Sequence, residues 1–282
     1  MENKIKLTSD STCDLTEELL EKSGVTLCPI AIILGDEERL DTVNIDAEGV
    51  LDFVERTGKL PKTAASSKEQ YKKFFKKQAE SGYSVIHFCI SSKASSCYNN
   101  AVEAAKEVKG VYVIDSLALS GGQGLQIMKA RDIIDEGKPV EEVVEEIKSI
   151  TKKTQLSFVV DTLEFLQKGG RCSTLAAVSA KLLKIHPSIY NEVGELKVRK
   201  KYIGNMERCL TQYVTDLFAE FKNYDGKRAF ITHSPSDKKL VDLVIKKAKE
   251  LFSFEEIYET FAGSTVTSHC GQNTIGLLFL NK

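Results

Sequence analysis

The sequence predicts a two-domain α/β protein, with a parallel-sheet N-terminal domain over residues 1–154 and a mixed-sheet C-terminal domain over residues 155–282. Through the first half, short β-rich runs alternate with amphipathic helical stretches, which is typical of a parallel sheet covered by helices. After Gln155 the alternation changes, and residues 187–202 form two extended segments joined at Gly194, a pattern that predicts a hairpin. A chain of 282 residues is long enough for two domains of ordinary size.

The first half carries strand and helix signals in regular order. Apolar and β-branched runs predict strands at residues 5–9, 85–90 and 111–115, and an extended run at residues 25–34 that Pro29 breaks. Helix starts are predicted at Asp14, which forms a capping-box pattern with Glu17, and at Asp46. Ser67 with Gln70 predicts a third start. Further helix boundaries are expected at Gly24, at Gly110, around residues 125–134 after a glycine-rich turn, and at Pro139.

The second half has longer elements around the predicted hairpin. Strands are expected at residues 156–160, 228–232 and 275–280. Helices are expected at residues 206–221 and from Asp237 onward. Because small ligands commonly bind between domains, we expect the ligand site at the domain interface.

Composition describes an ordinary globular protein. Hydrophobic residues make up 42%, charged residues 28%, and the formal net charge is −1, so there is no electrostatic reason for binding nucleic acid or anionic membranes. The N-terminal residues lack a secretory apolar region, and no apolar run approaches the roughly 20 residues that span a bilayer. We therefore expect a cytoplasmic protein without stable membrane insertion.

Cysteines and histidines are scattered along the chain. The cysteines are odd in number and lack the close pairs used for zinc or redox chemistry, so reduced thiols are expected. A metal site would have to be assembled by long-range folding, and none is predicted. The residues are Cys13, Cys28, Cys89, Cys97, Cys172, Cys209 and Cys270, with His87, His186, His233 and His269.

Four polar segments follow predicted strands, where open α/β sheets bind ligands. They are residues 9–12, 63–67, 91–96 and 115–116. The third segment holds four serines, more than a helix cap needs, and hydroxyl groups near a helix N-terminus can receive an anion. Three glycines follow the fourth segment, but their spacing matches neither the Rossmann nor the P-loop pattern, so nucleotide binding is not predicted.

A further candidate segment is Lys168-Gly169-Gly170-Arg171. Its glycines let the backbone turn sharply while delivering a guanidinium suited to a carboxylate or phosphate, although a helix C-cap with a surface arginine has the same pattern. His269 precedes the last strand, where a lone histidine is more often structural than catalytic. The sequence has no Gly-x-Ser-x-Gly elbow, which disfavours an acyl-enzyme hydrolase.

Taken in order, these segments resemble the motif series of the DegV family over essentially the whole chain. The matching pieces are Asp10-Ser11-Thr12, Ile90-Ser91-Ser92, Asp115-Ser116 and, most distinctive, residues 161–171 with the sequence DTLEFLQKGGR. The resemblance implies a parallel α/β domain joined to a mixed-sheet domain, a long-chain fatty acid as ligand and no cofactor. It implies a role as the binding subunit of bacterial fatty acid kinase, with the ATP-binding kinase subunit as partner. The implied carboxylate-binding residues are Thr63, Ser95, Arg171 and His269, with Ser92 close by.

On this interpretation the chain is a lipid-binding carrier and not an enzyme. Burying one methylene is worth about 0.8 kcal/mol, so a chain of about 16 carbons offers on the order of 12 kcal/mol before ordering costs. The carboxylate must be paired, because desolvating it alone costs several kcal/mol. The carrier would orient the carboxylate for attack on ATP held by the partner. Arg171, Arg199, Lys200 and Lys201 are candidates for the docking face.

Two other functions fit the sequence. One is a phosphotransfer enzyme acting on a small metabolite, with His269 or His233 as phosphate carrier or covalent anchor. A polar pocket without an apolar tunnel would favour it. The other is a lipid-responsive regulatory module that works without a kinase.

Overall fold

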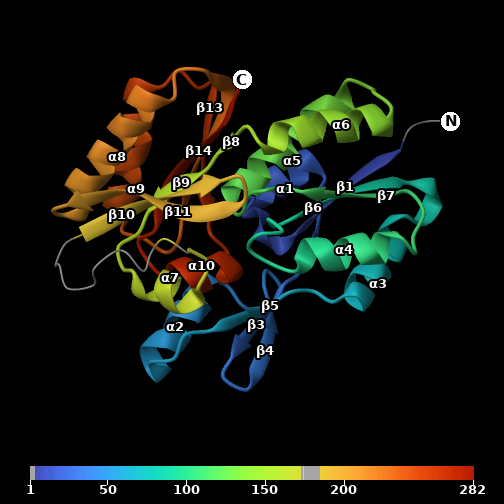
Figure 1. Ribbon diagram of the computed structural model, residues 1–282, viewed down its shortest axis with the longest axis horizontal. Helices are drawn as coiled ribbons and strands as arrows, with labels where there is room; N and C mark the ends of the chain where they lie inside the picture. The colour runs from blue at the N-terminus through green and yellow to red at the C-terminus, as the bar shows by residue number, and fades with distance from the viewer. Residues whose placement is uncertain (1–3, 173, 175–184) are drawn as a thin grey trace.

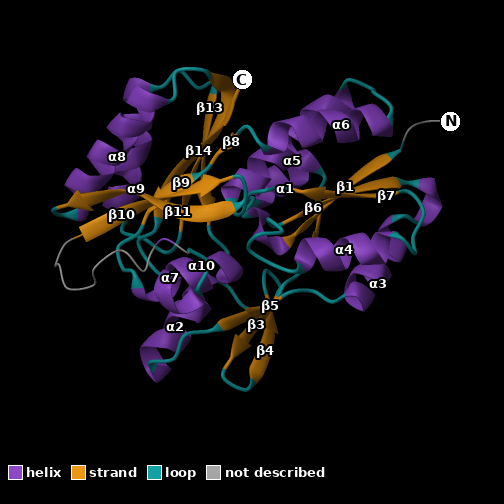
Figure 2. Cartoon of the chain, viewed as in Figure 1, coloured by secondary structure: helices purple, strands orange, loops and turns teal. Residues whose placement is uncertain are grey.

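The computed structural model describes residues 4–172, 174 and 185–282, which form three β-sheets with helices between and around them (Figures 1 and 2). The predicted two-domain α/β fold, with a parallel sheet and a mixed sheet, is confirmed. In Figure 1 the parallel sheet lies on the right, the mixed sheet on the left, and a small third sheet at the bottom. The boundary between residues 154 and 155 stays a proposal.

The N-terminal sheet has four parallel strands in the order β2-β1-β6-β7. They are β1 (Ile5–Asp10), β2 (Thr26–Cys28), β6 (Ser84–Cys89) and β7 (Val111–Asp115). The accompanying helices are α1 (Glu17–Ser23), α3 (Lys68–Gln78), α4 (Cys97–Ala105), α5 (Gly121–Asp135) and α6 (Val140–Thr151). Because the strands are parallel, their carboxyl ends meet at one edge, which brings the polar segments that follow them together.

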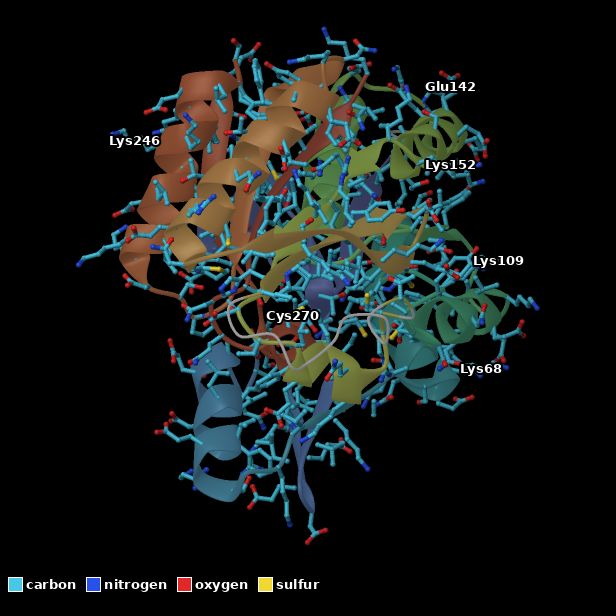
Figure 3. The ribbon with its side chains drawn as sticks, turned by 60° about the vertical axis from the view of Figure 1, so that its left-hand side comes forward. Lys68, Lys109, Glu142, Lys152, Lys246 and Cys270 are labelled. Carbon is cyan, nitrogen blue, oxygen red and sulfur yellow. The ribbon has the colours of Figure 1, made fainter. Side chains whose placement is uncertain are left out.

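A small antiparallel sheet is inserted between β2 and α3. It contains β3 (Ala31–Leu34), β4 (Glu37–Leu40) and β5 (Lys62–Ala64), with α2 (Ala47–Thr57) between the last two strands. We call residues 31–64 the small lobe; it projects at the bottom of Figure 3. The extended run predicted over residues 25–34 with a break at Pro29 is confirmed as two strands, because Pro29 has no backbone N–H for a ladder and separates β2 from β3.

The C-terminal sheet has the order β11-β10-β9-β14-β12-β13, and β8 also pairs with β14. Its strands are β8 (Thr154–Gln155), β9 (Ser157–Val159), β10 (Ile185–Glu192), β11 (Glu195–Ile203), β12 (Tyr224–His233), β13 (Glu256–Phe261) and β14 (Ile275–Asn281). Among the described strands of this sheet, β12 and β13 form the only parallel pair, and the predicted hairpin is confirmed by β10 and β11. The helices are α7 (Glu164–Gly169), α8 (Met206–Glu220), α9 (Lys238–Leu251) and α10 (Ser264–Cys270).

Helix α5 lies between the two large sheets, and its glycines permit the close approach. The predicted glycine-rich turn before a helix at residues 125–134 is wrong, since the helix already begins at Gly121. A β-carbon on Gly121 would stand 2.2 Å from Oγ1 of Thr232 in β12. One on Gly124 would stand 3.2 Å from the ring of Phe230, also in β12. These glycines therefore serve packing between the domains.

Helix caps follow the sequence at several positions. Asp46 accepts a hydrogen bond from the backbone N–H of Gly49 (2.8 Å), and Ser67 forms the predicted capping box. Asp14 is not the cap of α1, because Thr16 occupies that position. Two other predicted boundaries are confirmed, since Gly24 ends α1 and Asp237 caps α9. Helix α4 ends at Ala105 and not at Gly110, and Pro139 is the N-cap residue of α6.

Two hydrophobic cores stabilise the fold. The larger lies between the parallel sheet, its helices and the near face of the mixed sheet, and the smaller lies between the mixed sheet and helices α8 and α9. In Figure 3 the side chains of Lys109, Glu142 and Lys246 point outward, whereas Cys270 lies inside the molecule. Within the described ranges, no helix combines the length and the apolar composition that crossing a membrane requires.

Asp14 is buried at the junction of the two halves. Its carboxylate accepts hydrogen bonds from Oγ of Ser120 (2.5 Å) and from the backbone N–H of Gly263 (3.0 Å). The pKa of the Asp14 carboxyl is raised to about 7. Burial is the main cause and the nearby Asp41 carboxylate adds to it, whereas the two hydrogen bonds lower the pKa and offset part of the rise. The folded protein thus holds this group in its neutral form at acidic pH.

Asp14→Asn is expected to change how stability depends on pH. Since the folded pKa of about 7 lies above the ordinary value of 3.8, the unfolded wild-type chain ionises first as pH rises, and the wild-type protein loses stability between about pH 4 and pH 7. The asparagine cannot ionise, so the variant should gain about 4 kcal/mol relative to wild type between pH 4 and pH 8. Urea unfolding at a series of pH values measures this. A stability difference that is equal at both ends of the range would contradict it.

Candidate functional site

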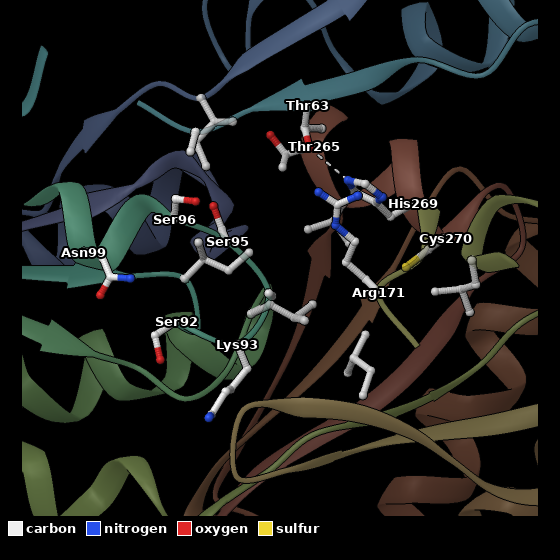
Figure 4. A pocket seen from close by; sticks show the side chains of 18 residues that line it. Thr63, Ser92, Lys93, Ser95, Ser96, Asn99, Arg171, Thr265, His269 and Cys270 are labelled. Atoms are coloured by element: carbon white, nitrogen blue, oxygen red, sulfur yellow. Dashed lines mark hydrogen bonds between the residues drawn. The ribbon is translucent and has the colours of Figure 1, made fainter. Parts of the chain in front are cut away.

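A cavity of about 480 Å³ lies where the carboxyl edge of the parallel sheet meets the small lobe and helices α7 and α10 (Figure 4). Its polar lining residues are Thr63, Ser92, Lys93, Ser95, Ser96, Asn99, Arg171, Thr265 and His269. Its apolar lining residues are Ile30, Ala65, Ile90, Ala94, Leu119, Leu166, Leu196, Val266 and Cys270. All five residues predicted to hold a carboxylate therefore line one cavity, and their role in binding stays a prediction.

Thr63 and His269 form one wall of the cavity. Thr63 lies in β5 of the small lobe and His269 in α10, and a hydrogen bond of 2.9 Å joins Oγ1 of the threonine to Nε2 of the imidazole (Figure 4). Burial and, to a smaller extent, the nearby Arg171 together lower the pKa of His269 to about 4. The imidazole is therefore neutral near pH 7.

The tautomer of His269 follows from its surroundings. Nδ1 is buried and has no hydrogen-bond partner among the described residues. A proton on Nδ1 would be an unsatisfied buried donor, at a cost of about 1–3 kcal/mol, so we assign the proton to Nε2. Nε2 then donates to Oγ1 of Thr63, and the threonine hydroxyl is free to donate to a ligand.

Arg171 reaches the cavity from the turn that ends α7. Gly170 adopts the left-handed conformation (φ 68°) that closes this helix, and Nη1 of Arg171 donates to the carbonyl oxygen of Gly169 (2.6 Å). Figure 4 shows the guanidinium beside His269. The two interpretations of this segment, a helix C-cap and a ligand-facing arginine, therefore hold together. Gly170 ends the helix, and the turn that it forms places the next side chain, Arg171, at the cavity.

The serine segment forms the opposite wall. Oγ of Ser95 accepts a hydrogen bond from the backbone N–H of Cys97 (3.3 Å) and donates to Sγ of Cys97 (3.2 Å). The backbone N–H of Ser92 donates to Oδ1 of Asp115 at the end of β7 (3.1 Å). Figure 4 shows Ser92 and Ser95 across the cavity from Thr63 and His269. Hydroxyl groups of the N-terminal half therefore face the same space as the imidazole and guanidinium of the C-terminal half.

Sequence reasoning missed the remaining lining residues. The polar ones are Lys93, Ser96, Asn99 and Thr265, and the branched aliphatic ones are Ile30, Ile90, Leu119, Leu166, Leu196 and Val266. Lys93 and Ser96 lie within the serine segment, residues 91–96, and Asn99 follows it three residues later, so that segment was the available signal. The aliphatic residues come from separate elements, and each matches the ordinary apolar pattern of its own segment.

The predicted docking residues do not share one location. Arg199 lies over the rings of Tyr190 and Phe221, pairs with Glu220 and lines a different cavity from Arg171. Two further positions lie on the same strand: Lys200 pairs with Asp216 (2.6 Å), and Lys201 is exposed. A docking face that includes Arg171 and Arg199 would have to extend over the two cavities that they line. The docking face stays a prediction.

His233 is poorly placed for the phosphate-carrier role considered above. Its Nδ1 lies 2.7 Å from the carbonyl oxygen of Ser234, and its Nε2 lies 3.2 Å from Oε1 of Glu259. It does not line the cavity that holds Thr63 and His269. Both ring nitrogens are engaged by oxygen atoms, which leaves neither available as a nucleophile.

A family model described as an uncharacterised protein of the DegV family matches residues 4–282. The chain belongs to the DegV family. A fatty acid-binding protein from Thermotoga maritima is 30% identical to this DegV protein over 280 residues, covering 97% of this chain and 96% of the relative.

Solved structures agree with the fold. A fatty-acid-binding DegV family protein from Thermus thermophilus superposes with a TM-score of 0.91 at 26% identity, covering 99% of this chain and 100% of the other. A DegV lipid-binding protein from Thermotoga maritima gives 0.87 at 28% identity, covering 99% and 98%. The fatty acid kinase B3 protein of Streptococcus pneumoniae, loaded with linoleic acid, shares the fold with a TM-score of 0.84 at 23% identity, covering 99% and 100%.

Proposed function

We propose that this DegV protein binds a long-chain fatty acid between its domains, residues 1–154 and 155–282, and presents the carboxylate to a separate ATP-dependent kinase subunit. One observation carries the proposal: hydroxyl and cationic groups from both halves share one cavity with six branched aliphatic side chains. Relatives of similar sequence and fold are fatty-acid-binding proteins, which supports the same ligand class here.

The two kinds of lining residue have different tasks. Aliphatic contacts to the alkyl chain supply most of the affinity, at about 0.8 kcal/mol for each buried methylene. The carboxylate is held by Thr63, Ser95, Arg171 and His269, with Ser92 near, because an unpaired carboxylate would cost several kcal/mol to desolvate. Arg171 supplies the positive charge, since His269 is neutral.

The proposed task of the chain in acyl-phosphate formation is positioning. The threonine hydroxyl, aligned by the Nε2 proton of His269, and the Ser95 hydroxyl fix the orientation of the carboxylate. A carboxylate oxygen then attacks the γ-phosphorus of ATP on the partner, and ADP leaves. In this proposal the chain supplies no nucleophile and no nucleotide site. A phosphohistidine at His269 is disfavoured because Nδ1, which carries the free lone pair, is buried and Nε2 is hydrogen-bonded to Thr63.

The bound ligand can be identified directly. Purified protein should release fatty acid into an organic extract at close to one molecule per chain, as measured by mass spectrometry with a mock-purified control. A polar metabolite in place of fatty acid would favour the phosphotransfer enzyme instead.

The role of a partner needs a second measurement. Lipid-loaded protein, ATP and a fatty acid kinase ATP-binding subunit should yield acyl phosphate, trapped as hydroxamate, and omission of either protein should abolish it. Lipid binding without acyl phosphate would favour the lipid-responsive regulatory module.

Gly169→Ala is expected to weaken fatty acid binding about tenfold. A β-carbon at Gly169 would stand 2.7 Å from Nδ1 of His269, so the imidazole must move and its hydrogen bond to Thr63 must weaken, at a cost near 1.4 kcal/mol. Titration with a fluorescent fatty acid measures the change.

Gly170→Ala is the matched control for this substitution. A β-carbon at Gly170 would have no neighbour within 4 Å, so alanine there costs only backbone strain from its positive φ. It should lower the thermal midpoint and leave affinity within about twofold. Equal affinity of the two variants would contradict the positioning of His269 by Gly169.

A further inference from the structure

The parallel sheet buries an imidazole, a carboxylate and a thiol on one face. Asp10 ends β1 and Cys89 ends the neighbouring strand β6, while His87 lies two residues before Cys89 and therefore on the same face. All three side chains are fully buried. Each residue has one possible metal-ligand atom, and these three atoms all lie within 4.8 Å of one another. We call these three residues the buried triad.

The spacing of the triad suits a tetrahedral metal ion. Oδ1 of Asp10 and Nε2 of His87 are 3.4 Å apart. Zinc bonds of about 2.0–2.2 Å to nitrogen and oxygen place two tetrahedral ligand atoms about 3.4 Å apart, and a sulfur ligand about 3.6 Å from either. Sγ of Cys89 lies within 4.8 Å of a ligand atom of each of the other two residues.

His87 has the orientation of a metal ligand. Nδ1 lies 2.9 Å from Oγ1 of Thr8, which fixes one side of the ring as a supporting residue does in metal sites. Nε2 is buried, faces Asp10 and has no hydrogen-bond partner among the described residues. The rings of Tyr71 and Phe75 hold the imidazole edge-on at 5.4 and 5.0 Å between centroids. The ring is therefore fixed with its unsatisfied nitrogen toward the triad.

Two more thiols adjoin the triad. Cys28 is the register partner of Asp10 on the next strand, and Cys97 begins α4. Burial raises the pKa of Cys89 well above its ordinary value, and Asp10, Cys97 and Cys28 lie near enough to add to the effect. A bound divalent cation would favour the thiolate of Cys89 over the thiol, because a coordinated thiol loses its proton to solvent on binding.

We propose that Asp10, His87 and Cys89 bind a thiophilic divalent cation of the zinc class, and that the Cys28 or Cys97 side chain moves closer on binding to supply the fourth ligand. Carboxylate, imidazole and thiolate are ligands that zinc accepts together, and closed tetrahedral sites are structural ones. Asp10 also accepts hydrogen bonds from Oη of Tyr71 (2.5 Å) and the backbone N–H of Ile90 (3.0 Å), which would orient the carboxylate. The cation would join β1 to β6 beneath the cavity, next to the Cys97 thiol that Ser95 contacts.

The test measures metal content of the whole chain without a polyhistidine tag. Because the site is enclosed, the metal is supplied during folding, by expression in zinc-supplemented medium. Wild type should retain close to one zinc per chain after dialysis against a mild chelator. Cys89→Ala and His87→Gln should retain at least about tenfold less. Expression with cobalt should give the visible bands of tetrahedral Co²⁺ and a thiolate charge-transfer band in wild type only.

Cys209→Ala is the matched control, since Cys209 is a buried cysteine of the other hydrophobic core. It should retain zinc and the cobalt spectrum. Circular dichroism of each variant shows whether it is folded. Wild type that retains less than about a tenth of a zinc per chain, or folded Cys89→Ala that retains as much as wild type, would overturn the proposal.

Discussion

Asp41→Ala is expected to lower the free energy of unfolding by about 4 kcal/mol. Asp41 is fully buried and accepts hydrogen bonds from Oγ of Ser11 (2.7 Å), from N (3.1 Å) and Oγ (2.5 Å) of Ser264, and from Oγ1 of Thr265 (2.7 Å). Alanine leaves these donors without an acceptor in a dry site. The residue joins the small lobe to the start of α10, so its loss should also loosen the helix that carries His269.

Asp46→Ala is the control for this substitution. Asp46 lies in the same lobe but is an exposed helix cap with one hydrogen bond to Gly49, so its loss should cost about 1 kcal/mol. Urea unfolding measures both variants. If the two cost the same, Asp41 does not hold the junction together as its contacts indicate.

The combined substitution of Thr63→Val and Ser95→Ala is expected to weaken fatty acid binding about 100-fold. Each hydroxyl would donate to the carboxylate, and a hydrogen bond to a charged group contributes about 1.5–3 kcal/mol. The two residues come from opposite walls of the cavity, so their effects should nearly add. Valine keeps the shape of threonine, which restricts the change to the polar group.

A matched control pair tests whether the loss is specific. Thr215→Val and Ser149→Ala change hydroxyls on exposed helical positions that bond only to the preceding turn. They should leave the affinity for a fluorescent fatty acid within about twofold. A Thr63→Val, Ser95→Ala protein that is folded by circular dichroism and binds within threefold of wild type, or about 0.7 kcal/mol, would refute the carboxylate assignment.

The central strands of the large sheets could be predicted because they bury both faces and carry continuous apolar runs. The strands around Ile86 and Ile231 are examples. The small lobe could not, since β3, β4 and β5 have only three or four residues and are half-exposed. Helix α10 was also missed, because its sequence STVTSHC is rich in residues that favour caps and strands; hydrogen bonds to Asp41 hold its first turn.

The polar half of the cavity was more predictable than the apolar half. Ser92 and Ser95 follow a buried strand in a segment with more hydroxyls than a cap requires, and Arg171 follows paired glycines. Leu119 and Leu196 carry no such signal, since one precedes α5 and the other lies in a hairpin strand. Their proximity depends on how the domains pack, which local patterns do not encode.

Strand β14 pairs with β9 and β12 in the interior of the mixed sheet, yet it follows every other strand of that sheet along the chain. On the ribosome the four parallel strands, complete by Asp115, can assemble while the rest is still being translated. The mixed sheet lacks its central member until the final segment emerges. A nascent chain should therefore have the serine segment of the cavity in place while its second half is still unpaired and prone to aggregation. We expect it to bind lipid only after β14 is inserted.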